Sequence, residues 1–193
     1  GKMGWEQGAW HPYCISRRVV PWLLLAAADG SASAWAYRLV ESLAAQLLFL
    51  EDNLERDLGG NHLLANLKAL LVGAACLRGV GPERWLRRFW PELLRQIEAQ
   101  ILPSGEHFER TPTYHAIVLE DLLDLATLAR HAFPHQGSAL RPAIEAMTHF
   151  LTAILHPDGQ IPLLGDSAFD ATPDPAALLD RARCWLARPD TST

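Results

Sequence analysis

The sequence has 193 residues, of which 49% are hydrophobic and 20% are charged. This composition is typical of a single globular domain and argues against a disordered chain. Lys and Arg number 17 while Asp and Glu number 22, which gives a net charge of −5. The acidic excess argues against a general nucleic-acid binder, because such proteins carry a basic face.

No segment of the sequence is long and apolar enough to span a membrane. The longest apolar run, residues 19–28, has ten residues and contains Pro21, whereas a spanning helix needs about 20. We expect no signal peptide in the first residues, GKMGW, since no basic stretch precedes an apolar core. Cys14, Cys76 and Cys184 are too few and too widely spaced for a disulfide framework or a CxxC metal site, so we expect three buried thiols.

Hydrophobic residues recur every three or four positions along the chain, and no stretch shows the long alternation of a strand. The pattern predicts an all-α fold with helices over residues 16–28, 33–57, 62–77, 82–101, 112–131, 141–155 and 176–187. The second helix is expected to bury a stripe formed by Trp35, Leu39, Leu43, Leu47 and Leu50. Asn61 and Thr111 have the composition of N-caps, and Pro112 suits a first helical position.

The two helices that begin at residues 62 and 112 are expected to point in the same direction. Helices joined by short loops run antiparallel to their neighbours, and one helix separates these two. Their N-termini should then share a rim, where amide groups and helix dipoles favour a carboxylate or a sulfate. The succession of helical hairpins suits an α/α toroid or a solenoid-like array.

Two segments gather polar side chains at these helix starts. Residues 59–66 (GGNHLLAN) place Asn61 and His62 behind two glycines, which allow the backbone to approach a ligand. Residues 105–115 (GEHFERTPTYH) concentrate an acid, a base, a phenol and a guanidinium. Structural roles stay open for both segments: Asn61 as a cap, His62 bonded to a neighbouring loop, and Tyr114 packed with its hydroxyl at the surface.

Taken together, these segments resemble the helical domain of bacterial heparinase II/III-like proteins. The resemblance is carried by residues 60–70 (GNHLLANLKAL), 101–115 (ILPSGEHFERTPTYH), 119–124 (LEDLLD), 156–162 (HPDGQIP) and 166–167 (DS), with an earlier stretch at residues 10–13 (WHPY), Ser16, Arg17 and Trp22. It spans nearly the whole chain, and its first two motifs are specific in combination.

The resemblance implies an incomplete α/α toroid of antiparallel helical hairpins, with residues 1–193 forming one helical domain. In complete members an antiparallel β-sandwich domain follows, and this sequence stops before one begins, so we expect a fragment. The implied activity is that of a polysaccharide lyase on uronate-containing chains, such as heparan sulfate and other glycosaminoglycans, or alginate. The resemblance is compatible with a periplasmic or secreted location and implies no cofactor.

The catalytic positions of the family carry over to Asn61, His62 and Tyr114. β-Elimination removes the proton on C5 of a uronate, next to a carboxylate whose charge opposes the carbanion. Asn61 is a candidate to donate a hydrogen bond to that carboxylate, helped by the helix N-terminus. Tyr114 is a candidate to protonate the leaving O4, and to remove the C5 proton when both groups lie on one face. His62 is a candidate base for the opposite face, as is a further His of the sandwich.

Substrate binding is assigned to Arg17, Glu109, Arg110 and His115. The two arginines would bind uronate or sulfate groups, and Glu109 would orient His62 or an arginine, although Glu109 and Arg110 could equally form a solvated pair. A phenol titrates near pH ~10, so a basic Tyr114 needs nearby positive charge, for which Arg110, His62 and His115 are candidates.

No metal site is expected. His131 and His135 have i,i+4 spacing, but Pro134 lies between them and no HExxH motif is present.

Two other functions stay open. A glycoside hydrolase on an α-toroid scaffold would use two carboxylates about 5 to 9.5 Å apart, chosen from Asp57, Glu106, Glu109 and Asp166. The second alternative is a helical domain that binds acidic glycans without catalysis. Trp10, Trp22 and Trp35 could stack against sugar rings, but we expect most of them to lie in the core.

Overall fold

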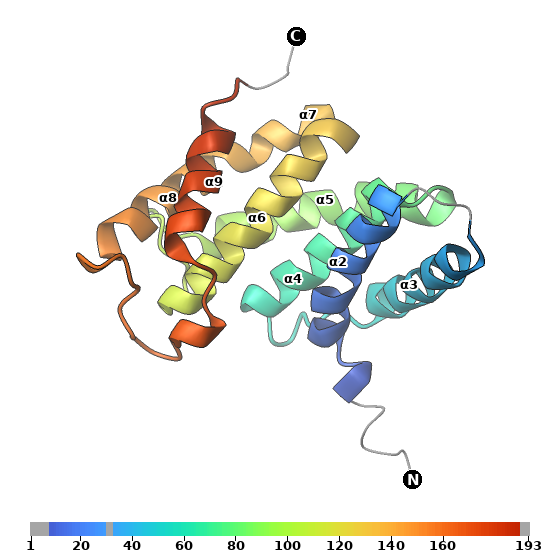
Figure 1. Cartoon of the computed structure of the whole chain (residues 1–193), viewed down its shortest axis with the longest axis horizontal. Helices are drawn as coiled ribbons and strands as arrows, with labels where there is room; N and C mark the ends of the chain where they lie inside the picture. Colours follow the sequence, from blue (N-terminus) through green and yellow to red (C-terminus); the bar gives the residue numbers. More distant parts are fainter. Residues whose placement is uncertain (1–7, 30–32, 190–193) are drawn as a thin grey trace. The chain divides into compact units, whose positions relative to one another are not determined.

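The computed structural model describes residues 8–29 and 33–189, and the chain folds into two compact units, residues 1–92 and 93–193. Its described helices are α2 (Pro12–Asp29), α3 (Ala34–Asp52), α4 (Gly60–Cys76), α5 (Val80–Gln100), α6 (Pro112–Ala132), α7 (Pro134–Gly137), α8 (Arg141–Ile154) and α9 (Pro175–Leu186) (Figure 1). Two short 3-10 helices, Ser138–Leu140 and Phe169–Ala171, and an isolated antiparallel bridge between Ile101 and His107 are also present. The predicted all-α class is confirmed. None of the described helices is long and apolar enough to cross a membrane.

The boundaries of α6, α8 and α9 agree with the sequence to within one residue, but the end of α3 does not. This helix ends at Asp52 rather than at residue 57, because Asn53 caps it. The Asn53 side chain donates to the carbonyl of Phe49 at 2.7 Å, and its backbone N–H donates to the carbonyl of Leu50 at 3.1 Å. Residues 53–59 therefore form a loop that leads to α4.

The prediction that Asn61 caps α4 is wrong. Gly59 is the N-cap, with a φ of 66° in the left-handed region that favours glycine. The helix consequently begins at Gly60, and Asn61 is a buried residue of its first turn.

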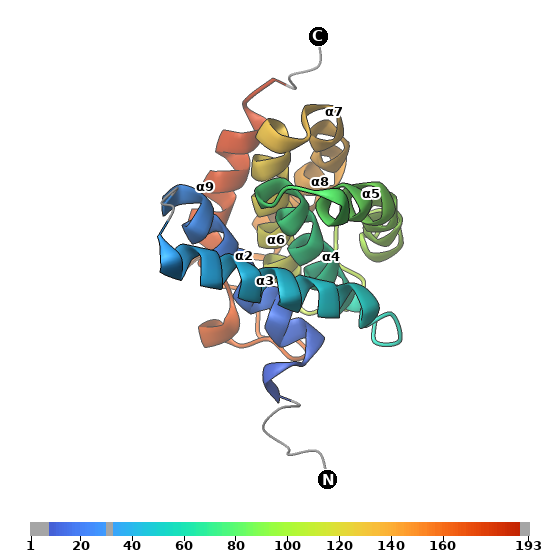
Figure 2. The same ribbon diagram turned by 90° about the vertical axis from the view of Figure 1, so that its right-hand side faces the viewer.

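In the first unit, α2, α3 and α4 pack against one another (Figure 2). The α4 helix is buried over most of its length, as its apolar sequence indicates. Of the stripe predicted on α3, Leu43, Leu47 and Leu50 are buried, whereas Trp35 is half exposed. The second unit has α6 at its centre, in contact with α7, α8 and α9.

Two expectations about burial are wrong. Trp10, Trp22 and Trp35 are 43%, 46% and 50% exposed rather than in the core, and Cys14 and Cys184 are exposed while only Cys76 is partly covered. The apolar sequence of α2 runs around the helix, but only one face of it is buried. An apolar residue type therefore does not by itself determine burial.

Glu51 joins α3 to α5 within the first unit. Its buried carboxylate accepts hydrogen bonds from Nε of Arg84 at 3.0 Å and from Nε1 of Trp85 at 2.8 Å. The hydrogen bond from Arg84, with that from Trp85 and the charges of Arg84 and Arg88, lowers the pKa of Glu51 despite its burial. The buried indole N–H of Trp85 is thereby satisfied.

Gly105 fixes the loop before α6 against α8, and its replacement is expected to destabilise the second unit. Its φ is 84°, and a Cβ at this position would run into the backbone carbonyl of Ala146. We expect Gly105→Ala to cost about 1–2 kcal/mol for the left-handed conformation and a further ~1–3 kcal/mol for the overlap. Chemical denaturation measures this free energy of unfolding.

Gly159→Ala is the matched control. Gly159 has a φ of 81°, and no heavy atom lies within 4 Å of the place that a Cβ would take, so this variant carries the conformational cost alone. Equal losses of stability in the two variants would contradict the close approach of Ala146.

Candidate functional site

The first part of the candidate site lies at the start of α4, where His62 is bound by a carboxylate. Nδ1 of His62 is 2.9 Å from Oε1 of Glu55 in the preceding loop. A carboxylate oxygen accepts hydrogen bonds and cannot donate them, so Nδ1 carries the hydrogen. In the neutral ring Nε2 is then the unprotonated nitrogen, and His62 can accept a proton at that atom.

Glu55 is held in turn by Asn66, one turn further along α4. Nδ2 of Asn66 donates to Oε2 of Glu55 at 3.0 Å and to Oγ of Ser16 at 3.0 Å, and Oδ1 accepts from the backbone N–H of Glu55 at 2.9 Å. Ser16 belongs to α2 and donates to the carbonyl of Pro12 at 2.9 Å. Asn66 is fully buried and Glu55 is 6% exposed, so this network fixes the carboxylate from two sides.

Two aromatic residues of the N-terminal segment complete this group. The ring of Tyr13 stacks on the ring of His62 with centroids 4.3 Å apart and an interplanar angle of 21°. Nδ1 of His11 lies 3.7 Å from Oε1 of Glu55. We call Glu55, His62, Asn66, Tyr13 and His11 the Glu55 cluster.

Sequence reasoning misses Glu55 because the apolar periodicity places residue 55 in a helix that in fact ends at Asp52. The available signal is Asn66, which stands four residues after His62 in the same motif and so lies on the same face of α4. The proposed orienting role of Glu109 toward His62 is not needed, because Glu55 already binds Nδ1 of that ring.

We expect the Glu55→Ala variant to lose the fixed tautomer of His62. Nitrogen NMR of the ring should report hydrogen on Nδ1 in the unmodified chain and a mixture of the two neutral tautomers in the variant. Asn66 also loses an acceptor, so the free energy of unfolding should fall by about 1–3 kcal/mol.

Glu92→Ala is the control for this experiment. Glu92 forms a two-bond ion pair with the exposed Arg56, at 3.0 Å for each bond, and its loss should cost about 0–1 kcal/mol with no change at His62. A His62 ring with hydrogen on Nε2 in the unmodified chain would contradict the assigned geometry.

The second part of the candidate site lies at the start of α6. Pro112 is at the first helical position and Thr111 is the N-cap, as predicted, but the Thr111 hydroxyl donates to the carbonyl of Glu109 at 3.3 Å. The backbone N–H of Thr113 is instead bound by Oγ of Ser167 at 3.3 Å. Tyr114 follows in this first turn and is half-buried, so the C-terminal segment anchors the helix turn that carries the phenol.

Arg110, immediately before this turn, has a φ of 53° and is exposed. A left-handed conformation is uncommon for a residue other than glycine and costs of order 1 kcal/mol. The backbone N–H of Arg110 donates to the carbonyl of His107 at 2.9 Å, which closes the turn. Glu109 is half-buried beside it.

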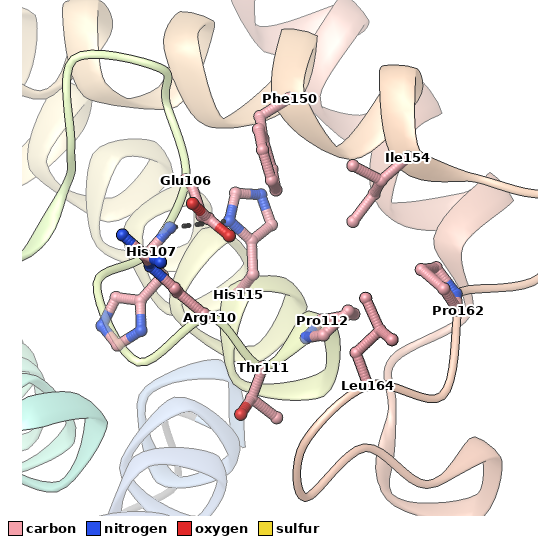
Figure 3. A pocket seen from close by; sticks show the side chains of 10 residues that line it. All are labelled: Glu106, His107, Arg110, Thr111, Pro112, His115, Phe150, Ile154, Pro162 and Leu164. Atoms are coloured by element: carbon pink, nitrogen blue, oxygen red, sulfur yellow. Dashed lines mark hydrogen bonds between the residues drawn. The ribbon is translucent and has the colours of Figure 1, made fainter.

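His115 is a buried, hydrogen-bonded residue rather than an open base. Its Nδ1 accepts from the backbone N–H of His107 at 3.3 Å (Figure 3). Its Nε2 donates to the carbonyl of Met147 at 3.0 Å. Burial lowers the pKa of His115 to about 4, and burial together with the neighbouring His115 lowers the pKa of His107 to about 4. Both rings are uncharged at neutral pH, so His115 does not supply the positive charge that a basic Tyr114 requires.

A small pocket of about 50 Å³ opens beside His115. Figure 3 shows Phe150, Ile154, Pro162 and Leu164 on one side of it and Glu106 and Arg110 near His107 on the other. Its walls are mainly apolar, with charged groups only at one side.

The predicted site residues fall into both units. Asn61, His62 and the exposed Arg17 belong to the first, whereas Glu109, Arg110, Tyr114 and His115 belong to the second. The Glu55 cluster is formed within the first unit alone, and the convergence of the two groups on one groove stays a prediction. Among the described residues no three His, Cys, Asp or Glu side chains are grouped so that they could hold a metal ion.

Comparison with known proteins finds a matching family model and a solved structure with a similar fold. A family model described as Heparinase II/III N-terminus matches residues 3–183. The chain is also similar to the crystal structure of heparinase III, with 20% sequence identity and a TM-score of 0.68, over 78% of this chain and 24% of that one. The chain thus spans about a quarter of the length of that protein, and the likeness is one of fold. No curated protein matches the sequence.

Proposed function

Because the chain belongs to the family of heparinase II/III N-terminal domains, we propose that it is the helical portion of a polysaccharide lyase. The proposed reaction is β-elimination in a uronate-containing acidic polysaccharide. The two units would form part of an incomplete α/α toroid, and a β-sandwich domain of the parent protein would supply further groups to the site.

The observation that carries this proposal is the hydrogen bond from Nδ1 of His62 to Glu55, at 2.9 Å. It leaves Nε2 as the proton acceptor of the ring, at the first turn of a helix and next to Asn61. A general base has to present an unprotonated atom to the proton that it removes. His62 meets this requirement for a C5 proton on its side of the sugar.

Stabilising the uronate carboxylate is the second requirement. The elimination places additional negative charge next to that group, and hydrogen-bond donors at this position lower the barrier. The side-chain amide of Asn61 and the first backbone N–H groups of α4 are donors of this kind, and Gly59 has no side chain with which to cap them. Asn61 is therefore assigned to the carboxylate.

Tyr114 is assigned to donate its phenol proton to the leaving group. In epimers that present the C5 proton on the same face as the leaving group, Tyr114 would also remove that proton. With His115 uncharged, Arg110 is the positive group of the second unit nearest to Tyr114 in sequence. Arg17 and Arg110 are assigned to uronate or sulfate groups and Glu109 to the orientation of an arginine. His115 would stabilise the turn through its hydrogen bond with the His107 backbone, and it would not bind an anionic substrate group, because its ring is uncharged.

The test is a product assay of the full-length parent protein on a panel of uronate polysaccharides. Elimination leaves an unsaturated uronate that absorbs in the ultraviolet, and its products are lighter by one water than those of hydrolysis. We expect the absorbing products. Saturated products would indicate a glycoside hydrolase, and binding without any cleavage would indicate a glycan-binding domain, so either result would overturn the proposal.

A further inference from the structure

A basic pocket in the second unit lies at the opposite end of α6 from Tyr114. It measures about 180 Å³ and is formed at the C-terminal ends of α6 and α9, which run side by side in the same direction (Figure 1). Tyr114 stands in the first turn of α6, about 24 Å from Arg130 along the helix at about 1.5 Å per residue. The pocket is therefore separate from the Tyr114 turn.

The charges that line this pocket all have one sign. Arg130, His131, Arg181 and Arg188 contribute to its walls, and none of the acidic residues that the structure describes does. Asp124 and Glu120 bind Arg181, but they do not line the pocket. In a chain with a net charge of −5, such a concentration of guanidinium groups favours an anion.

Trp185, on the wall of the pocket, adds a hydrogen-bond donor without an acceptor. The residue is 6% exposed, and its Nε1 has no hydrogen-bond partner within the described part of the chain. Buried indole N–H groups are ordinarily satisfied, and an unsatisfied one calls for a missing acceptor. Because Trp185 lies on the wall of the pocket, its indole N–H signal reports on an anion bound there.

Two arginines already bind carbonyl groups at the C-terminal end of α9, next to the pocket. The guanidinium groups of Arg130 and Arg141 lie 4.8 and 5.1 Å from the ring of Trp185. Arg130 donates to the carbonyl of Trp185 at 3.3 Å and Arg141 to that of Leu186 at 2.9 Å. These carbonyls would otherwise repel an anion at a helix C-terminus, so the two arginines make the end of α9 compatible with one.

We propose that this pocket binds an oxyanion, either a sulfate or carboxylate group of an acidic saccharide or a free inorganic oxyanion. Planar guanidinium groups pair with both kinds of group through charge-assisted hydrogen bonds. The assignment to a saccharide rests on the proposed function, whereas the oxyanion site does not. A saccharide held here would be bound at a distance from the Tyr114 turn.

The indole N–H signals of the 193-residue chain test the site directly. Inorganic sulfate, exchanged for chloride at constant ionic strength, should shift the Trp185 Nε1–H signal in NMR spectra in a saturable way. Trp185→Phe assigns the signal. The Trp85 signal is the internal control, because its N–H is already bound to Glu51 at 2.8 Å, and it should stay in place.

Arg188→Gln is expected to weaken sulfate binding about threefold to tenfold, since one charge-assisted contact is lost. Arg183→Gln is the matched control. Arg183 lies five residues earlier, on α9, pairs with the exposed Asp180 at 3.0 Å, and does not line the pocket. It should leave binding unchanged.

Two further titrations, with a sulfated disaccharide and with glucuronate, identify the source of the anion. If the Trp185 shift saturates at a lower concentration of either saccharide than of inorganic sulfate, the anion is a saccharide group. If neither saccharide binds more tightly than sulfate, the anion is a free oxyanion. The absence of a saturable shift at Trp185 with any of these probes, or an equal effect of both arginine variants, would overturn the proposal. None of these readouts depends on turnover, so a failure here is distinguishable from a failure of the elimination assay.

Discussion

Replacing Tyr114 by Phe in the parent protein is expected to lower the rate of elimination by about 10²- to 10⁴-fold, the contribution of a positioned acid or base. The substitution removes one oxygen atom from a half-buried side chain in the first turn of α6. The fold should be retained, because the turn is anchored through Thr113 and Ser167. The loss should appear in kcat, with substrate binding changed little.

Tyr37→Phe is the matched control, because Tyr37 is 64% exposed and belongs to the first unit. Initial rates of ultraviolet absorbance on the preferred polysaccharide measure both variants. Turnover by Tyr114→Phe within a few-fold of that of the unmodified protein would remove the phenol from the chemistry.

The second large effect is expected at Asn61. If Asn61 has the role proposed for it, its replacement by Ala removes a hydrogen-bond donor from the uronate carboxylate and should cost about 10²- to 10³-fold in kcat, as for other donors that act on developing charge. Asn61→Asp has nearly the same shape but places a negative charge there. We expect the Asp variant to be slower than the Ala variant, because like charges repel most strongly in a buried site.

Asn53→Ala is the control that distinguishes a loss of catalysis at Asn61 from a loss of stability. Asn53 is exposed and its side chain caps α3 through the Phe49 carbonyl at 2.7 Å, so this variant should lose about 0.5–1.5 kcal/mol of stability and no catalysis. Equal rates for Asn61→Ala and Asn61→Asp would show that the amide does not face the substrate charge. Unfolding curves for all three variants confirm that folded protein is compared.

The order of helices can be predicted from the sequence because periodicity and turn residues act locally. The start of α6 follows from Thr111 and Pro112 alone, since the ring of Pro fixes the backbone for a first turn. The side chain that binds the Thr113 N–H cannot be predicted, because Ser167 lies 54 residues away. Long-range partners of this kind depend on packing, which one sequence does not display.

The candidate site also contains both residues that the sequence identifies and a residue that depends on packing. Asn61, His62 and Tyr114 can be named as candidates from motifs, but Glu55 is missed, because the apolar periodicity of α3 continues into the loop that carries it. His115 is a candidate by residue type, and burial makes it neutral. The exposed tryptophans show the opposite error, since their apolar character does not lead to burial.

Asn66 links the proposed role of His62 to the integrity of the first unit. One amide binds the loop through the Glu55 N–H, the carboxylate that orients the imidazole, and α2 through Ser16. Heating that detaches this amide would release the loop and the ring in a single event. The fixed orientation of the His62 ring should accordingly be lost with local melting, so the temperature at which the proposed elimination declines would report on the contacts of Asn66.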